Sequence, residues 1–292
     1  MHEPLPEDLK TALNSDLEAL KAAEEAPGVS VELLRFTEKV AIAQTRAQAA
    51  IRAGGTKGSE DGDEQGLRLD EFRFDSKVLR DLLGGLEEAA DGSVSEIGVS
   101  VLVRAVNERP EILEAVTRAC LPGGDARILS ETARELELPV EALLLVGRLL
   151  AAPFVHEARL SRGASERLDA RDAEGREAGR CPACGALPGL AVLDKEDGAR
   201  KLLCSLCGEL WVAPRLMCTA CGNKEQSKLG TLCLDENDPR WIEVCDVCRR
   251  YLKTVDESRL GADDDVRLRA EDARTVHLDI LAEEEGYVRS TF

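Results

Sequence analysis

The spacing of apolar residues along the chain changes near residue 180. Before that point, apolar side chains recur every three or four residues and so fall on one face of a helix, as in Leu9, Leu13, Leu17 and Leu20. The same spacing recurs through residues 1–178, where the strict alternation typical of strands does not appear. We therefore predict a helical domain of about six to eight helices over this part of the chain.

Residues 181–253 follow a different pattern. The segments "RKLLCSLCGELWVAP" and "PRWIEVCDVCRRYLKTV" each carry apolar residues into a pair of cysteines and out again, which is typical of short strands that feed turns. The acidic segment that follows contains one helical pattern. The predicted fold class is α+β and multidomain: a helical N-terminal domain, two tandem four-cysteine ribbon modules and a C-terminal helical tail. The predicted bounds are 1–178, 179–215, 216–255 and 256–292.

Eight of the ten cysteines form four Cys-x-x-Cys pairs. Two thiolates separated by two residues can bind one metal ion from a single tight turn, and tetrahedral coordination of Zn²⁺ or Fe needs two such turns. The spacing is C-x2-C-x19-C-x2-C in the first two pairs and C-x2-C-x23-C-x2-C in the last two, in or close to the range of known zinc sites. We predict two metal sites with these ligands: Cys181, Cys184, Cys204 and Cys207 in the first, and Cys218, Cys221, Cys245 and Cys248 in the second.

The spacing alone leaves open which pairs share a metal ion. We favour pairing in chain order, because the segment between two pairs can then fold back as a hairpin. The alternative joins the first pair to the third and the second to the fourth, but only ten residues separate Cys207 from Cys218. Glycine follows three of the pairs and permits the positive φ that such a turn needs, whereas Arg249 follows the fourth. We expect this arginine to alter the shape of the second site without changing its ligands.

The formal net charge of −18 argues against general binding to nucleic acid, because phosphate backbones are repelled. The acidity lies in the flanks, since residues 180–253 contain eleven basic and ten acidic residues. The N-terminal segment lacks the basic and apolar regions of a secretory signal, and the longest apolar stretch is interrupted by Arg148 and Pro153. We therefore expect a cytoplasmic protein with reduced thiols and without membrane insertion.

No pattern typical of catalysis is apparent. The chain has no Gly-rich phosphate loop, no Ser–His–Asp pattern and only three histidines, and a four-thiolate site leaves no open coordination position. We expect no enzymatic activity, and a purely structural role of both metals remains an alternative because small modules need metal to fold. A partner-binding surface is predicted beside the metal turns, with packing over the sulfurs as the alternative for the tryptophans. Its residues are Trp211, Trp241, Tyr251, Arg249 and Arg250.

Three features together resemble one known family. A helical N-terminal half leads into "CPACG…RKLLCSLCGELW…RLMCTACG…CDVCRRYLK", and the chain continues to "AEDARTVHLDILAEEEGYVRSTF". This combination resembles FdhE, the formate dehydrogenase accessory protein family, specifically over residues 181–292 and only in general layout over 1–180. The resemblance implies two rubredoxin-like modules with two iron ions, zinc being the alternative, above all in recombinant protein. Carried over position by position, it implies the same eight cysteines as ligands.

The resemblance also implies a function. Members of the family are cytoplasmic and serve the biogenesis of respiratory formate dehydrogenases, whose catalytic subunits carry a molybdenum–pterin cofactor and selenocysteine. The chain would be an accessory or maturation factor that binds this catalytic subunit and supports its assembly. The alternatives are a ribbon-type nucleic-acid-binding protein, with a basic patch beside Trp211 and Tyr251, and a rubredoxin-like electron-transfer protein. Whether the chain forms a homodimer is left open.

Overall fold

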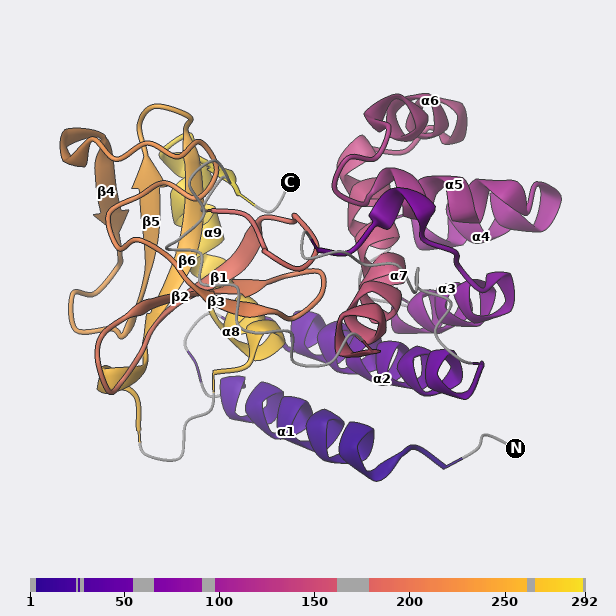
Figure 1. Ribbon diagram of the computed structural model, residues 1–292, viewed down its shortest axis with the longest axis horizontal. Helices are drawn as coiled ribbons and strands as arrows, with labels where there is room; N and C mark the ends of the chain where they lie inside the picture. The colour runs from indigo at the N-terminus through magenta and orange to yellow at the C-terminus, as the bar shows by residue number, and fades with distance from the viewer. Residues whose placement is uncertain are drawn as a thin grey trace. The chain divides into compact units, whose positions relative to one another are not determined.

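The chain forms two compact units, one of residues 1–18 and 30–163 and the other of residues 19–29 and 164–292. The first consists of helices and the second is built on a sheet (Figure 1). Residues 162–178, between the last helix of the first unit and the sheet, lie outside the part of the chain that is described. The computed structural model describes residues 4–24, 26, 29–54, 66–90, 98–161, 179–261 and 266–290.

The helical unit is built from amphipathic helices that follow one another along the chain. In α2, for example, residues at helical spacing such as Leu34, Val40 and Ile51 are buried. Among the described residues, seven α-helices precede the sheet, which agrees with the predicted number. They are α1 (Glu7–Ala23), α2 (Val31–Gly54), α3 (Ser76–Ala90), α4 (Val99–Glu108), α5 (Glu111–Ala119), α6 (Ala126–Leu136) and α7 (Val140–Ser161), with the short 3-10 helix η1 (Leu69–Glu71) before α3.

Helix α7 organises the core of this unit, because it packs against α2, α3, α5 and α6. Its Val146 and Leu150 are buried completely or nearly so. Gly147 lets the end of α5 approach closely, since a Cβ there would lie 2.3 Å from the Sγ of Cys120. Burial also raises the pKa of Cys120 to about 12, so this thiol stays neutral. The helical unit therefore has a hydrophobic core of its own.

No single helix among the described residues is long and apolar enough to cross a bilayer. The pair α6 and α7 reaches that length and apolarity only when both helices are taken together, and the two are bent by 118°.

The second unit is built on one mixed sheet with the strand order β3-β2-β1-β6-β5-β4, and β7 pairs with β6. The antiparallel pairs β1–β2 and β5–β6 are joined by a parallel pairing of β1 with β6, in which Ala191 lies opposite Thr254. Both four-cysteine segments therefore contribute to the same sheet, and the predicted mixture of helix and sheet is confirmed. The strands are β1 (Pro188–Leu193), β2 (Arg200–Cys204), β3 (Leu210–Val212), β4 (Leu229–Leu232), β5 (Arg240–Cys245), β6 (Arg250–Asp256) and β7 (Val288–Arg289).

The C-terminal segment covers one face of this sheet (Figure 1). It contains two helices, α8 (Leu268–Arg274) and α9 (Val276–Glu284), instead of the single helix that its pattern predicted, because the backbone leaves the helical region at Thr275. Leu278 of α9 packs with Ile242 of β5 and with other buried residues. The residues on both sides of position 255 thus pack together in one unit, and the predicted domain bounds remain predictions.

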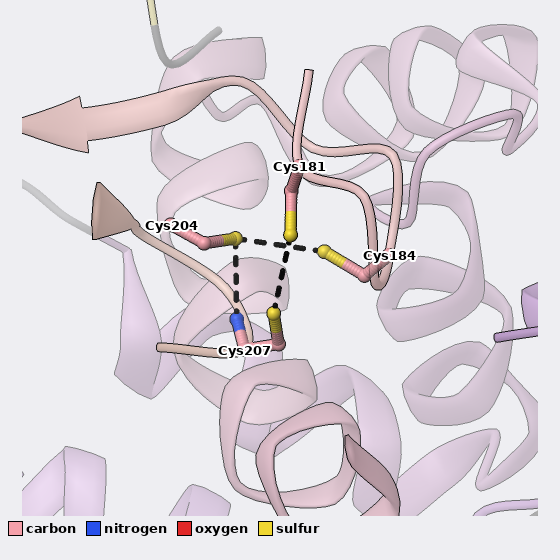
Figure 2. A group of neighbouring side chains, drawn as sticks. All are labelled: Cys181, Cys184, Cys204 and Cys207. Carbon is pink, nitrogen blue, oxygen red and sulfur yellow. Dashed lines mark hydrogen bonds between the residues drawn. The ribbon is translucent and has the colours of Figure 1, made fainter. Parts of the chain in front are cut away.

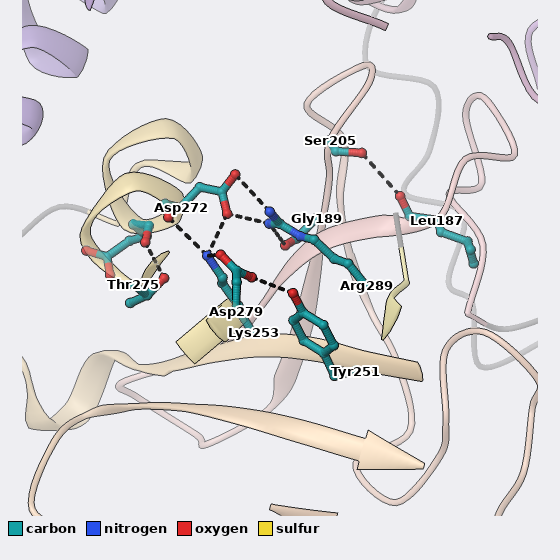
Figure 3. Close-up of polar contacts among 10 residues, drawn as sticks. Leu187, Gly189, Ser205, Tyr251, Lys253, Asp272, Thr275, Asp279 and Arg289 are labelled. Carbon is teal, nitrogen blue, oxygen red and sulfur yellow. Dashed lines mark hydrogen bonds and ion pairs between the residues drawn. The ribbon is translucent and has the colours of Figure 1, made fainter. Parts of the chain in front are cut away.

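Buried charges join the C-terminal segment to β6 (Figure 3). Lys253, whose side chain is only 1% exposed, donates to the carboxylate of Asp272 at 2.9 Å and also pairs with Asp279. Arg289 of β7 binds the same Asp272, and Tyr251 donates its hydroxyl to Asp279 at 2.6 Å. A charge buried this deeply is tolerated only when it is paired and hydrogen-bonded. The network therefore requires α8, α9 and β7 to lie where the carboxylates and Arg289 can reach β6.

Candidate metal centres

Each Cys-x-x-Cys pair closes the same tight turn. The amide of the residue after the second cysteine donates to the carbonyl of the first cysteine, at 2.8 to 3.2 Å in the four turns. That residue has a positive φ in every case, 71° to 76° for the three glycines and 55° for the arginine. The left-handed conformation is what bends the chain back behind the second sulfur. The four residues are Gly185, Gly208, Gly222 and Arg249.

Arg249 takes the place of glycine without changing the hydrogen bond of the turn. Its amide donates to the carbonyl of Cys245 at 2.8 Å. Its guanidinium lies 3.8 Å from the ring centroid of Tyr287, bonds Asp246 at 3.1 Å and donates to the carbonyl of Glu285. A left-handed conformation costs a residue with a Cβ about 1 kcal/mol, and contacts of this kind offset the cost. The expected change of shape is therefore absent from the backbone of this turn.

The first site lies where the turns before β1 and after β2 face each other (Figure 2). The Sγ atoms of Cys181 and Cys207 are 3.5 Å apart, and those of Cys184 and Cys204 are also 3.5 Å apart. The amides of Leu206 and Cys207 both point at the Sγ of Cys204, at 3.4 Å each. All four sulfurs lie within 4.8 Å of one another. The site joins the first two pairs, which is the pairing in chain order.

The second site has the same construction, from a turn that precedes β4 and the turn that joins β5 to β6. The Sγ atoms of Cys218 and Cys248 are 3.6 Å apart, and those of Cys221 and Cys245 are 3.8 Å apart. The side-chain amide of Asn223 approaches the Sγ of Cys245 at 3.9 Å. These four sulfurs also lie within 4.8 Å of one another. The third and fourth pairs therefore form a second cluster that is separate from the first.

Both clusters fit a metal ion with four thiolate ligands. With metal–sulfur bonds of about 2.3 Å, the sulfurs of a regular tetrahedron lie about 3.8 Å apart. The shortest distances in the two clusters, 3.5 to 3.8 Å, match this value. Hydrogen bonds from the neighbouring cysteines hold the pKa of Cys204 well below its usual range and raise the pKa of Cys184. The first cluster thus places a thiolate in a buried position that a cation would neutralise.

The two clusters differ in their exposure to solvent. All four cysteines of the first are buried, and none is more than 4% exposed. In the second, Cys221 is exposed and Cys248 is half-buried. Val247, between the last two ligands, is 59% exposed. A molecule in solution can therefore reach the second site, whereas the first is shielded.

In a comparison with known families, the two clusters fall in regions matched by two different domain models. The model of the FdhE central domain matches residues 180–215, which contain the first cluster. The model of the FdhE C-terminal domain matches residues 216–292, which contain the second. Over residues 180–292, this chain matches the FdhE family. The resemblance seen in the cysteine motifs is thereby confirmed.

Individual relatives extend this finding. The FdhE homologue of Aquifex aeolicus is 37% identical over 113 residues, which cover 37% of this chain and 38% of that protein. The homologue of Pectobacterium carotovorum is 32% identical over 199 residues, 62% of each chain. These matches span less than two thirds of the relatives' lengths. The crystal structure of the FdhE protein from Pseudomonas aeruginosa has the same fold, with a TM-score of 0.58 at 20% identity over 100% of this chain and 97% of that one.

The structure brings together only some of the residues predicted to bind a partner: Trp241, Arg250 and Tyr251 line one pocket, whereas Trp211 and Arg249 do not. Trp211 and Tyr251 are only 4% and 2% exposed, so neither presents its side chain. Trp241 is half-buried, and Arg250, also half-buried, donates to a carbonyl of β7 at 3.3 Å. Arg249 is exposed but lies against Tyr287. A role in partner binding stays a prediction, which the structure leaves room for only at Trp241, Arg249 and Arg250.

Arg200 and Lys253 belong to the basic patch that the nucleic-acid alternative needs, but the structure buries both side chains. The side chain of Arg200 is 1% exposed and pairs with Glu243 at 2.5 Å, and Lys253 is equally buried. For Arg200 a signal was available, because it lies in phase with the buried Leu202 and Cys204 of β2. An arginine at such a position has to find an anion inside the fold.

Proposed function

We propose that the chain is a cytoplasmic accessory factor that binds the catalytic subunit of a respiratory formate dehydrogenase and supports its assembly. The observation that carries the proposal is that each of the two four-cysteine clusters lies within a region matched by an FdhE domain. The proposed role is not catalytic. With four thiolates on each metal ion, neither site would keep a position open for substrate.

The proposed cofactors are two iron ions in rubredoxin-like sites, with zinc as the alternative in recombinant protein. The ligands are the eight cysteines of the two clusters. Thiolates suit both Zn and Fe, and the clusters supply thiolates alone. Bound iron would supply a one-electron redox couple. The residues of the chain hold its charge, since the amides of Leu206 and Cys207 point at a ligand sulfur and stabilise the thiolate.

The difference in exposure supports different roles for the two sites. The buried first site would act within the fold, since it ties the turn before β1 to the turn after β2. The second site would face the client, because Cys221 and Val247 are exposed there. A change of one unit of charge at this accessible site would act directly on the affinity for a bound subunit. Equal affinity of the oxidised and reduced forms would contradict this redox role.

The test is capture of a tagged copy from its native cytoplasm under anaerobic conditions, followed by identification of the proteins that accompany it. We expect a formate dehydrogenase catalytic subunit with the wild-type chain, and its loss in the variant Cys181→Ser/Cys184→Ser. The matched control is Cys233→Ser, because Cys233 is exposed and belongs to neither cluster.

Two results would contradict the proposal. One is capture of nucleic acid or of a redox partner without any dehydrogenase subunit. The other is unchanged capture of the subunit by a variant in which metal analysis shows that both sites are empty. After the first result the function would have to be sought elsewhere, whereas after the second the chain would bind the subunit without help from its metal sites.

A further inference from the structure

A pocket of about 350 Å³ lies in the sheet unit beside the second cysteine cluster. Its size is that of pockets that hold a small ligand or a few side chains of a partner. Trp241 and Glu243 of β5 line it, and because they are two residues apart their side chains stand on the same face of the sheet. Ile242, between them, packs with α9 on the other face. The pocket therefore opens on the face that α9 does not cover.

Arg200 supplies a buried donor to this pocket. It is 2% exposed as a whole residue and is held by the carbonyl of Pro214 at 3.0 Å and by the carboxylate of Glu243. Its Nε has no hydrogen-bond partner. A buried guanidinium N–H without an acceptor is costly, so a ligand that brought an acceptor within reach of this Nε would supply the missing hydrogen bond.

A second arginine stands at the rim. Arg215 lines the pocket, and its Nη1 donates to the carbonyl of Gly198 at 2.8 Å, a neutral acceptor. Arg250 also lines the pocket. Apart from the metal ligands Cys218 and Cys245, the charged side chains of the lining are three arginines and one glutamate, in a chain whose formal net charge is −18. The ligand that fits this contrast is an anion, which the rest of the acidic surface would repel.

The other residues of the pocket indicate which kind of molecule carries the anionic group. Leu216 lines the pocket and is 55% exposed, and Trp241 is half-buried, so apolar surface surrounds the arginines. Thr231 of β4 also lines the pocket, and β4 lies at an edge of the sheet. An extended peptide can approach along such an edge and place one side chain in a pocket next to it.

We infer that this pocket binds an acidic peptide of a partner protein: a glutamate or aspartate side chain between Arg200 and Arg215, flanked by apolar side chains on Leu216 and Trp241. That the peptide belongs to the dehydrogenase subunit rests on the proposed function. The preference of the pocket for a carboxylate does not.

The test follows the indole N–H signal of Trp241 by NMR in the full metal-loaded chain while the peptide acetyl-Leu-Glu-Leu-amide is added. Trp211, the only other tryptophan, does not line the pocket and serves as an internal reference. We expect the Trp241 signal alone to shift, and we expect the glutamine peptide acetyl-Leu-Gln-Leu-amide to bind about tenfold more weakly or worse, as loss of a hydrogen bond between charged groups implies.

The variant Arg215→Gln should weaken binding of the glutamate peptide by a similar factor. Lys224→Gln is the matched control, because it removes one positive charge from an exposed residue that does not line the pocket. The inference is overturned if the glutamate peptide leaves Trp241 unchanged at millimolar concentration, if the glutamine peptide binds equally well, or if acetate alone shifts the signal as much. If Arg215→Gln loses the peptide but still captures the dehydrogenase subunit, the pocket does not serve that subunit, while the proposed function stands.

Discussion

At the scale of single residues, the sheet unit depends on a few buried or partly buried charges that pair with one another. Asp272 receives hydrogen bonds from Lys253 at 2.9 Å and from Arg289 at 3.2 Å. Burial would raise the pKa of its carboxyl, but the charges of Arg289 and Lys253 outweigh this and lower the pKa to about 2. Asp272 therefore stabilises the fold as a carboxylate and not as an acid.

This gives stability a defined dependence on pH. Because the pKa is lower in the folded than in the unfolded chain, the contribution is complete above about pH 4 and is lost as pH falls toward 2. The side chain is 38% exposed and partly screened, so we expect Asp272→Asn to cost about 1 kcal/mol at pH 7. The measurement is denaturant unfolding of both proteins at several pH values, with metal content followed in parallel.

The difference between Asp272→Asn and wild type should stay constant from neutral pH to about pH 5 and shrink below about pH 4. Asp81→Asn, at an exposed position of α3, is the control and should show no such trend. A difference that grew on acidification would mean that the carboxyl is protonated in the folded protein.

At the scale of elements, the recurring unit is the metal turn. Four turns share one hydrogen bond and one left-handed residue, although the fourth has arginine where the others have glycine. Nothing lies within 4 Å of a Cβ built at Gly222, so a side chain there would feel only the strain of its φ of 72°. At Arg249 the same strain is combined with contacts to Asp246 and Tyr287.

Three variants separate strain from contacts. Gly222→Ala should lower the free energy of unfolding by about 1 kcal/mol through strain alone. Arg249→Ala keeps the strain and loses the contacts, whereas Arg249→Gly loses both, so we expect the alanine variant to be less stable than the glycine variant by about 1 kcal/mol. Denaturant unfolding of the metal-loaded proteins measures the order of stability of the three variants and the wild type. Equal stability of the two Arg249 variants would show that the turn is not strained.

At the scale of the whole molecule, each of the two units is stabilised internally by different interactions. The helical unit has an apolar core in which Val116, Leu143 and Leu150 are almost completely buried. The sheet unit combines smaller apolar clusters, such as Leu190, Val192 and Val255, with the two cysteine clusters. Metal binding contributes folding free energy wherever the apolar core is small.

Removal of metal should therefore affect the two units unequally. After treatment with a strong chelator, we expect the amides of β1, β2, β5 and β6 to lose protection from hydrogen exchange, while those of α2, α5 and α7 keep it. Hydrogen exchange read by mass spectrometry resolves the segments, and return of metal should restore the strands. Loss of protection in α5 and α7 as well would show that the helical core depends on the metal sites.

Much of the candidate site could be predicted because its signals are local. A Cys-x-x-Cys turn brings two sulfurs together within a few residues, and apolar spacing marks a helix over three or four turns. The eight cysteines and the mixture of helix and sheet were visible in this way. The prediction of a single C-terminal helix was wrong, because the helix is interrupted at Thr275. No glycine or proline at this position signals the interruption in the sequence.

The sequence by itself determined the metal turns and the amphipathic helices, since both depend on residues close together in the chain. Only the tertiary structure decided that β1 and β6 pair in parallel and join both cysteine modules into one sheet. It also decided that Arg200 meets Glu243 inside the fold and that a pocket lined by three arginines opens beside the second site. The physical reason is that the register of β1 with β6 and the pairing of Arg200 with Glu243 connect residues more than forty positions apart. No local periodicity encodes them.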